Sequence, residues 1–416
     1  IPKPPLPFLL SPAIFLPLMP NRSIKPASRT SRVAYAIRDI VVLAEKVARQ
    51  GKEMLYLNIG DPNLFDFRTP PHIIEATYRA LRENQNGYAP SSGVPEAREA
   101  IAREAQRKGI RSVRDVFVTT GATEAIDICF AALADRGENL LIPSPGYPTY
   151  SAILNKFEVE PRNYVLDEGN RWQPALEDIE KKIDRKTRGI VLINPNNPTG
   201  ALCDEETVRG IVRLALKHNL VIFSDEIYDR LILDGGRYAS PAALDADVPV
   251  VTLSGLSKNY LAPGFRVGWA VISGDARVLG GYLEGVNKLL RARLCANHPE
   301  QWAIRPALEG DQSHLAETTA KLSRRRDLTV KMLNSIPGIT CVKPEGAFYA
   351  YPRIELPISD DDFVRRLIEE CGVVSVPGTG FGQAKGTKHF RVVFLPPEGV
   401  LEKAYRKIAA FCRLIS

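Results

Sequence analysis

Six short apolar runs recur through the middle of this chain, and longer amphipathic stretches separate them. The runs span residues 116–119, 140–142, 190–193, 220–223, 250–253 and 267–272. Continuous apolar runs are typical of strands buried on both faces, and their alternation with helices favours parallel pairing. We therefore expect an α/β fold in which helices cover both faces of a mostly parallel sheet.

The last 80 residues have a different pattern, because short strands and helices follow one another closely from about residue 338 to residue 414. This pattern indicates a smaller α+β module with a core of its own. A chain of 416 residues is also longer than one ordinary hydrophobic core supports. We expect a large α/β domain and a smaller α+β domain.

The charge of the chain is concentrated near its start. Residues 1–50 contain eight Lys and Arg against two acidic residues, which accounts for +6 of the formal net charge of +7. The remaining chain is close to neutral, and its basic clusters at 181–188 and 321–326 are typical of solvated helix faces. We expect no nucleic-acid partner.

Residues 1–18 are apolar but contain six prolines, which a membrane-spanning helix does not tolerate. We expect no membrane partner and interpret these residues as a leader or a mis-set start outside the fold. A second interpretation is an organelle transit peptide, because residues 19–38 are rich in Ser and Arg and contain no acid. The six cysteines are widely spread without a C-x-x-C pair, which favours a reducing, cytoplasmic location.

Polar motifs follow several of the apolar runs, where an open α/β sheet binds its ligands. Gly121, Ala122 and Thr123 lie between a strand and a helix, so their amides could bind phosphate; a tight connection is the simpler alternative. The segment 194–200 contains Asn-Pro steps that place amide side chains at a strand end, although it could be only a turn.

Two further motifs place a charged side chain at the end of a strand. Asp225 ends a buried strand, where a carboxylate is costly unless a cation pairs with it, and a structural ion pair is the alternative explanation. Lys258 also follows a strand, where a dry site can lower its pKa and make it a Schiff-base nucleophile. Arg266 could bind a phosphate. These residues occur in a fixed order: Asp225 follows Asn197 by 28 residues, Lys258 follows Asp225 by 33, and Arg266 follows Lys258 by 8. Each motif alone is a weak signal, but their combination at these gaps indicates a shared site.

This combination resembles the class I/II aminotransferases, the fold-type I pyridoxal-phosphate enzymes, over roughly residues 30–416. Within that family the chain is most similar to the alanine aminotransferases. The segments that carry the resemblance are 57–62, 194–200, 255–258, 293–295, 345–349 and 389–397.

The resemblance implies pyridoxal 5′-phosphate as the cofactor and assigns roles to its catalytic residues. Lys258 forms the internal aldimine with the cofactor aldehyde and then shuttles a proton. Asp225 pairs with the pyridine nitrogen and keeps it protonated. Tyr228 and Asn197 donate hydrogen bonds to the ring phenolate oxygen. Tyr147 stacks on the ring.

The same resemblance implies how the ends of the ligands are held. The phosphate is bound around Ala122 and Thr123, by Ser257 and Arg266, and by Tyr88 of a neighbouring subunit. A homodimer with shared active sites follows from that last contact. Arg391 grips the substrate α-carboxylate, and Gly60 and Asn197 belong to the same substrate site. Gly255 departs from the family, because many relatives have a phosphate-binding Ser at that position.

The family pattern also places the domain boundaries. It implies that residues 19–60 form an arm and part of the small domain, that 61–300 form the large cofactor-binding domain, and that 301–416 form the small C-terminal domain. The implied reaction moves an amino group from L-alanine, or a similar small amino acid, to 2-oxoglutarate by a ping-pong mechanism.

Several alternatives remain at this point. The enzyme could use another donor (aspartate, an aromatic or a branched-chain amino acid), or it could be a pyridoxal-phosphate-dependent lyase on the same fold. A pyridoxal-binding gene regulator would need an N-terminal DNA-binding domain, for which about 30 residues are too few. The five histidines are scattered and no H-E-x-x-H motif occurs, so we expect no metal.

Overall fold

The computed structural model describes residues 23–33 and 36–415 of the chain. The leader predicted for residues 1–18 lies outside the described residues. No helix within the described part is long and apolar enough to cross a membrane.

One eight-stranded sheet forms the centre of the molecule, with strand order β2-β9-β8-β7-β6-β3-β4-β5. Its strands are β2 (Val113–Thr120), β3 (Asn139–Ser144), β4 (Glu160–Asp167), β5 (Gln173–Pro174), β6 (Thr187–Ile193), β7 (Val221–Asp225), β8 (Val250–Gly255) and β9 (Val267–Ser273). The four pairs from β8 through β7, β6 and β3 to β4 are parallel, which confirms the expected mostly parallel α/β sheet.

Strand β9 is antiparallel to both of its neighbours, β2 and β8. Its apolar run did not reveal this direction, because a strand that is buried on both faces has the same continuous pattern in either orientation. Strand β4 produced no apolar run, since its first half is polar and partly exposed.

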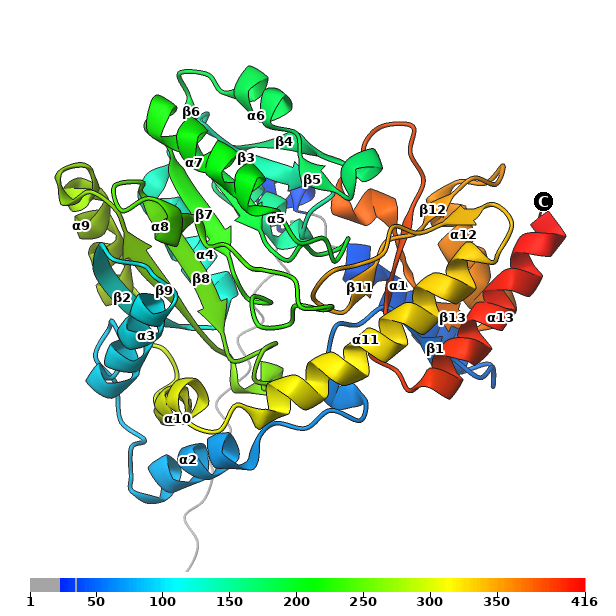
Figure 1. Cartoon of the computed structure of the whole chain (residues 1–416), viewed down its shortest axis with the longest axis horizontal. Coiled ribbons are helices and arrows are strands. Elements are labelled where there is room, and N and C mark those ends of the chain that lie inside the picture. The colour runs from blue at the N-terminus through cyan, green and yellow to red at the C-terminus, as the bar shows by residue number, and fades with distance from the viewer. Residues whose placement is uncertain (1–22, 34–35, 416) are drawn as a thin grey trace, which may run out of the picture.

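Helices cover both faces of the sheet (Figure 1). One face carries α4 (Ala122–Leu133), α5 (Pro148–Lys156) and α9 (Ala276–Ala292). The other carries α3 (Pro95–Arg107), α6 (Leu176–Lys182), α7 (Glu205–His218) and α8 (Pro241–Leu244). In β6, Ile190 and Leu192 pack in one core while Val191 and Ile193 pack in the other, so the strand is apolar throughout.

The remaining strands are short and form three small sheets. β1 (Leu55–Tyr56) pairs in parallel with β13 (Val373–Val374), and β10 (Ile339–Thr340) pairs with β12 (Arg353–Ile354). The third sheet has the order β11 (Tyr349–Ala350), β15 (Phe390–Val393) and β14 (Val376–Pro377).

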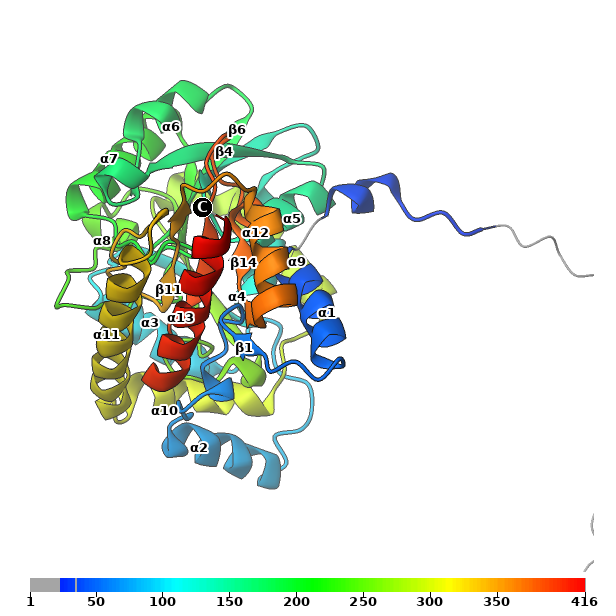
Figure 2. The same cartoon turned by 90° about the vertical axis from the view of Figure 1, so that its right-hand side faces the viewer.

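A separate core joins early and late elements of the described chain. Leu57 packs in the same apolar cluster as Phe390 and Leu401. Figures 1 and 2 show α1 (Ala36–Ala48), in blue, beside the orange C-terminal elements. The helices around this core are α11 (Ser313–Asn334), α12 (Asp360–Arg366) and α13 (Glu398–Ile415). Helix α10 (Ile304–Glu309) packs instead against α3 and against α2 (Pro71–Arg82).

Candidate active site

A cavity of about 410 Å³ lies where the parallel strands end. Asp225 is the last residue of β7 and Ile193 is the last residue of β6, while Ala122 begins α4. Tyr349 of β11 and Arg391 of β15 complete the wall of the cavity. The cavity therefore lies at the carboxyl edge of the sheet, which is the position that open α/β folds use for ligands.

Eleven of the twelve site residues predicted from the sequence line this one cavity. They are Gly60, Ala122, Thr123, Tyr147, Asn197, Asp225, Tyr228, Ser257, Lys258, Arg266 and Arg391. The twelfth, Tyr88, does not line the cavity of its own chain and is 82% exposed. An exposed position is what a residue that reaches a second subunit requires.

Asp225 is a buried anion at the floor of the cavity. Its Oδ2 accepts a hydrogen bond of 2.7 Å from Tyr150 Oη, and its Oδ1 accepts one of 3.2 Å from the Ile227 amide. Burial raises the pKa of Asp225 to about 6, although these two hydrogen bonds oppose the shift. No basic side chain among the described residues forms an ion pair with this carboxylate. The structural ion pair weighed as an alternative is therefore not found at Asp225.

Lys258 lies across the cavity, and its Nζ donates a 2.7 Å hydrogen bond to the Gly60 carbonyl. Burial is the main cause that lowers the pKa of Lys258 to about 8; Asp61 opposes the shift, and Arg391 and Arg266 contribute to it. An amine with this pKa is partly neutral near physiological pH and can attack a carbonyl carbon.

The start of α4 forms an anion cradle. Gly121 precedes the helix with φ +77°, and Ala122 and Thr123 occupy its first turn, where amides lack helical carbonyl partners. A Cβ on Gly121 would collide with the Arg266 guanidinium, so the glycine lets Arg266 approach the helix start. Arg266 also donates a 2.9 Å hydrogen bond from Nη1 to the Pro263 carbonyl.

Gly255, which departs from the family pattern, faces Gly268 across the β8–β9 pair. A Cβ at Gly255 would lie 2.6 Å from the Val267 carbonyl oxygen. The close approach of these two strands therefore requires glycine at this position and explains the missing hydroxyl.

Arg391 is fully buried between two aromatic rings. Its guanidinium carbon lies 4.6 Å from the centre of the Tyr349 ring and 4.8 Å from that of Phe381. Its Nη1 donates to Asn197 Oδ1 at 3.0 Å, and its Nη2 donates to the Asn58 carbonyl at 2.6 Å. These contacts fix the orientation of the planar fork at the cavity wall.

Three site residues were not found from the sequence. Tyr150 lies one helical turn after Tyr147 in α5, a spacing that could have indicated a shared face. Tyr349, whose hydroxyl lies 2.9 Å from that of Tyr228, belongs to a segment that carried the family resemblance but received no role. Asn58 contributes only its backbone carbonyl, a group that every residue has, so the residue type at this position does not indicate the contact.

With this geometry established, the class of protein is clear: the chain belongs to the aminotransferases of class I and II, whose family model matches residues 52–408. It is an aminotransferase with the fold-type I architecture. Enzymes of this family act on amino acids and 2-oxo acids and use pyridoxal 5′-phosphate. No cluster of metal-binding side chains occurs within residues 23–33 and 36–415.

Two curated proteins and one solved structure show which members of the family this chain is similar to. The chain is 40% identical to the glutamate-pyruvate aminotransferase AlaA of Haemophilus influenzae, over 94% of this chain and 98% of that protein. It is 37% identical to an alanine aminotransferase of Mycobacterium bovis, over 94% and 93% of the two chains. The solved structure of an alanine aminotransferase from Pyrococcus furiosus superposes with a TM-score of 0.91 and 41% identity, covering 94% of this chain and all of that chain.

Proposed function

We propose that this chain transfers the amino group of L-alanine, or of a similar small amino acid, to 2-oxoglutarate with pyridoxal 5′-phosphate as its cofactor. One observation carries the proposal: a lysine with a lowered pKa and a buried carboxylate without a cation line the same cavity as a buried arginine. The names of the relatives at 37–41% identity support alanine as the donor.

The cavity suits this cofactor in three places. Asp225 lacks a basic partner among the described residues, so a protonated pyridine nitrogen would supply the counter-charge that its burial calls for. The first-turn amides of α4 and Arg266 would hold the phosphate, together with Ser257. Tyr147 would stack on the ring. When bound, the cofactor supplies an electron sink for the substrate Cα.

Three further side chains of the cavity, Lys258, Tyr228 and Asn197, would then take part in the chemistry at the cofactor ring. Lys258 Nζ would take the proton from the substrate Cα and deliver it to the carbon of the cofactor aldehyde group. Tyr228 and Asn197 would donate hydrogen bonds to the ring oxygen. Burial raises the pKa of Tyr228 well above its usual value, so the hydroxyl stays protonated and available as a donor.

Arg391 would bind the α-carboxylate of both substrates. Its fork matches the two oxygens of a carboxylate, and the stacked rings of Tyr349 and Phe381 exclude water from the pair. The backbone of Gly60 would contact the same carboxylate. A Cβ at Gly60 would collide with the Tyr349 hydroxyl, so only glycine leaves this wall open.

We also propose a homodimer in which Tyr88 reaches the phosphate site of the second copy. Its 82% exposure supports this role. Beside it in sequence, α2 exposes Ile74, Tyr78 and Leu81 at helical spacing, and these form an apolar stripe that a second copy would cover.

The domain boundaries near residues 60 and 300 belong to the same proposal. The pairing of β1 with β13 supports an N-terminal contribution to the small domain. Closure of that domain would bring Arg391 and Gly60 onto the substrate. A cytoplasmic location is proposed from the cysteine pattern alone.

The direct experiment is a donor panel. The purified protein with pyridoxal 5′-phosphate and 2-oxoglutarate is offered alanine, aspartate, tyrosine and leucine, and glutamate is measured. We expect the highest kcat/KM with alanine. Glutamate from a different donor would correct the substrate, whereas no glutamate from any amino acid would contradict the aminotransferase assignment.

A further inference from the structure

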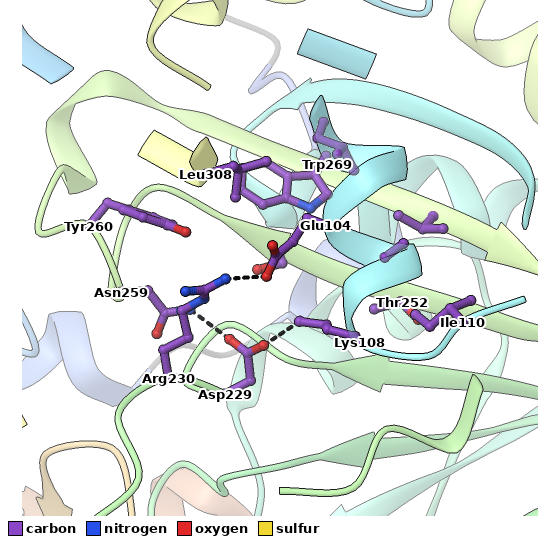
Figure 3. A pocket seen from close by; sticks show the side chains of 14 residues that line it. Glu104, Lys108, Ile110, Asp229, Arg230, Thr252, Asn259, Tyr260, Trp269 and Leu308 are labelled. Atoms are coloured by element: carbon purple, nitrogen blue, oxygen red, sulfur yellow. Dashed lines mark hydrogen bonds and ion pairs between the residues drawn. The ribbon is translucent and has the colours of Figure 1, made fainter. Parts of the chain in front are cut away.

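The segment that follows Asp225 enters a buried ionic cluster behind the cavity wall. We name it the Lys108 cluster, and it consists of Lys108, Glu226, Asp229 and Asn259. Lys108 directly follows α3, and its Nζ lies 3.1 Å from Glu226 Oε2 and pairs with Asp229 Oδ2. Figure 3 shows Lys108 and Asn259 converging on Asp229, next to a cavity of about 20 Å³. None of the four side chains lines the substrate cavity.

The cluster is enclosed by protein. The Glu226 side chain is 0% exposed, that of Asp229 is 3% exposed and that of Lys108 is 21% exposed. Although burial acts to lower it, the pKa of Lys108 is raised because Asp229 and Glu226 hold the ammonium form. Glu226 Oε1 also accepts hydrogen bonds from Ser224 at 3.0 Å and Ser240 at 2.6 Å. The single Lys108 ammonium thus pairs with two buried carboxylates.

A second ion group next to the cluster balances its charge. Arg230 pairs with Glu104, and Arg107 pairs with the same carboxylate at 2.8 Å. With Lys108, these two arginines supply three positive charges against Glu104, Glu226 and Asp229. Removal of Lys108 would therefore leave one uncompensated negative charge in the interior, which is strongly unfavourable.

Each of the three partners that join Lys108 in the cluster is the chain neighbour of a proposed catalytic residue. Glu226 follows Asp225, Asp229 follows Tyr228, and Asn259 follows Lys258. Asn259 Nδ2 donates to Asp229 Oδ1 at 2.7 Å, and its carbonyl lies 3.0 Å from His314 Nε2. The cluster therefore connects the backbone segments that carry all three cavity residues.

We propose that Lys108 is a positioning residue, which holds the Asp225–Tyr228 segment and the Lys258 segment in one fixed arrangement for transamination. The inference rests on the proposed function, because it assigns Lys108 to the geometry of that same site. It also has an electrostatic consequence: burial is the main cause that raises the pKa of Asp225, the negative charge of Glu226 adds to this shift, and the Lys108 ammonium offsets that charge.

The test uses the cofactor-loaded enzyme and Lys108→Met, which removes the charge and keeps the aliphatic chain. Lys321→Met is the matched control, because Lys321 is 17% exposed and pairs with Asp66 away from the cavity. Lys108→Arg restores a cation. Asn259→Ala breaks the link to the Lys258 segment but leaves both carboxylates paired, so it carries the test if Lys108→Met does not fold.

Three quantities are measured: kcat, KM for the amino donor, and the pH midpoint of the visible absorbance of the bound cofactor. We expect Lys108→Met to lower kcat by about 100-fold with KM changed by less than about threefold, since misplacement by roughly 1 Å has this effect. The absorbance midpoint should move by about one pH unit. Asn259→Ala should lower kcat by about tenfold, and Lys108→Arg should recover most of the loss.

A purely structural role would give a different result. Lys108→Met and Asn259→Ala would then lower the unfolding temperature as Lys321→Met does, while kcat and the absorbance midpoint of the folded enzyme would stay at wild-type values. That outcome would overturn the positioning role and leave the proposed function intact. A wild-type enzyme that binds no cofactor and forms no glutamate would instead overturn both.

Discussion

Tyr150 Oη donates a 2.7 Å hydrogen bond to Asp225 Oδ2, and this bond joins α5 to the end of β7 beneath the active-site cavity. The tyrosine hydroxyl is buried, and burial together with the nearby Asp225 raises its pKa well above the usual value. It therefore remains a donor at every physiological pH. Its bond favours the ionised form of Asp225, against the burial that disfavours it.

Replacing Tyr150 by Phe should shift the pH dependence of cofactor binding. Asp225 has a pKa of about 6, so cofactor affinity should fall as pH decreases through about 6, because a protonated carboxyl cannot pair with a pyridinium. Without the Tyr150 bond, this fall should begin about one pH unit higher. Titration of the apoprotein with cofactor between pH 5 and about 8.5 measures the shift.

Tyr282→Phe is the control for this experiment. Tyr282 is another buried tyrosine, and it donates to the Cys129 carbonyl at 3.2 Å, away from the cavity. The Tyr282→Phe variant should leave the pH midpoint of cofactor binding unchanged. Equal midpoints in Tyr150→Phe and the wild type would contradict the role assigned to the bond.

Asp225→Asn should stabilise the apoprotein while it abolishes transamination. The folded-state pKa of Asp225 is raised from 3.8 to about 6, so the native state favours the protonated form, and stability is lost as pH rises from about 4 through about 6. Two pH units correspond to about 3 kcal/mol. The asparagine, which stays neutral, should therefore be more stable than the wild type at pH 8.

The comparison at about pH 3 provides the internal check, because this lies below both the unfolded-state pKa of 3.8 and the folded-state pKa, so Asp225 is then largely protonated in both states. Denaturant unfolding of both apoproteins at the two pH values gives the difference in free energy. A variant that is less stable than the wild type at pH 8 would show that the Asp225 anion is not a cost to the fold.

Lys258 should capture the cofactor with a pH dependence of its own. Its pKa is lowered to about 8, mainly by burial, so the fraction of neutral amine, and with it the rate of covalent capture, should rise with pH to a midpoint near 8. Stopped-flow mixing of apoprotein and pyridoxal 5′-phosphate measures that rate. Free lysine side chains, with a pKa near 10.4, serve as the reference. A midpoint above 10 for the protein would contradict the lowered pKa.

Subunit complementation should show that two chains build each site. Tyr88→Ala removes the residue proposed to reach across, and Lys258→Ala removes the amine of the site itself. A mixed dimer has one site with Lys258 from one chain and Tyr88 from the other. Random pairing of equal amounts should therefore restore about a quarter of wild-type activity at limiting cofactor. If each chain supplied its own Tyr88, mixing would restore nothing.

Much of the sheet was predictable, because strands such as β6, buried on both faces, produce apolar runs that mark their position. The direction of β9 was not predictable, since burial on both faces hides strand orientation. The motif residues such as Lys258 and Arg266 were predictable as candidates because several occur at characteristic gaps. Their convergence on one cavity with Arg391, more than 120 residues beyond Arg266, comes from the fold.

The buried ionic partners could not be read from the sequence at all. Lys108 follows the polar helix α3 and resembles an ordinary solvated lysine, yet it pairs with Glu226, 118 residues away. The structural ion pair weighed for Asp225 occurs instead at its neighbour Glu226. Pairing over such separations is set by tertiary packing, which a local pattern does not encode.

A single-turnover reaction with L-alanine tests the central claim most directly. The cofactor-loaded enzyme is mixed with excess L-alanine and no 2-oxo acid, and pyruvate is measured against the concentration of chains. We predict one pyruvate per chain and then no more until 2-oxoglutarate is added, with none from Lys258→Ala. Continuous product formation without a 2-oxo acid would indicate a lyase, and full activity in Lys258→Ala would contradict the assignment of the site.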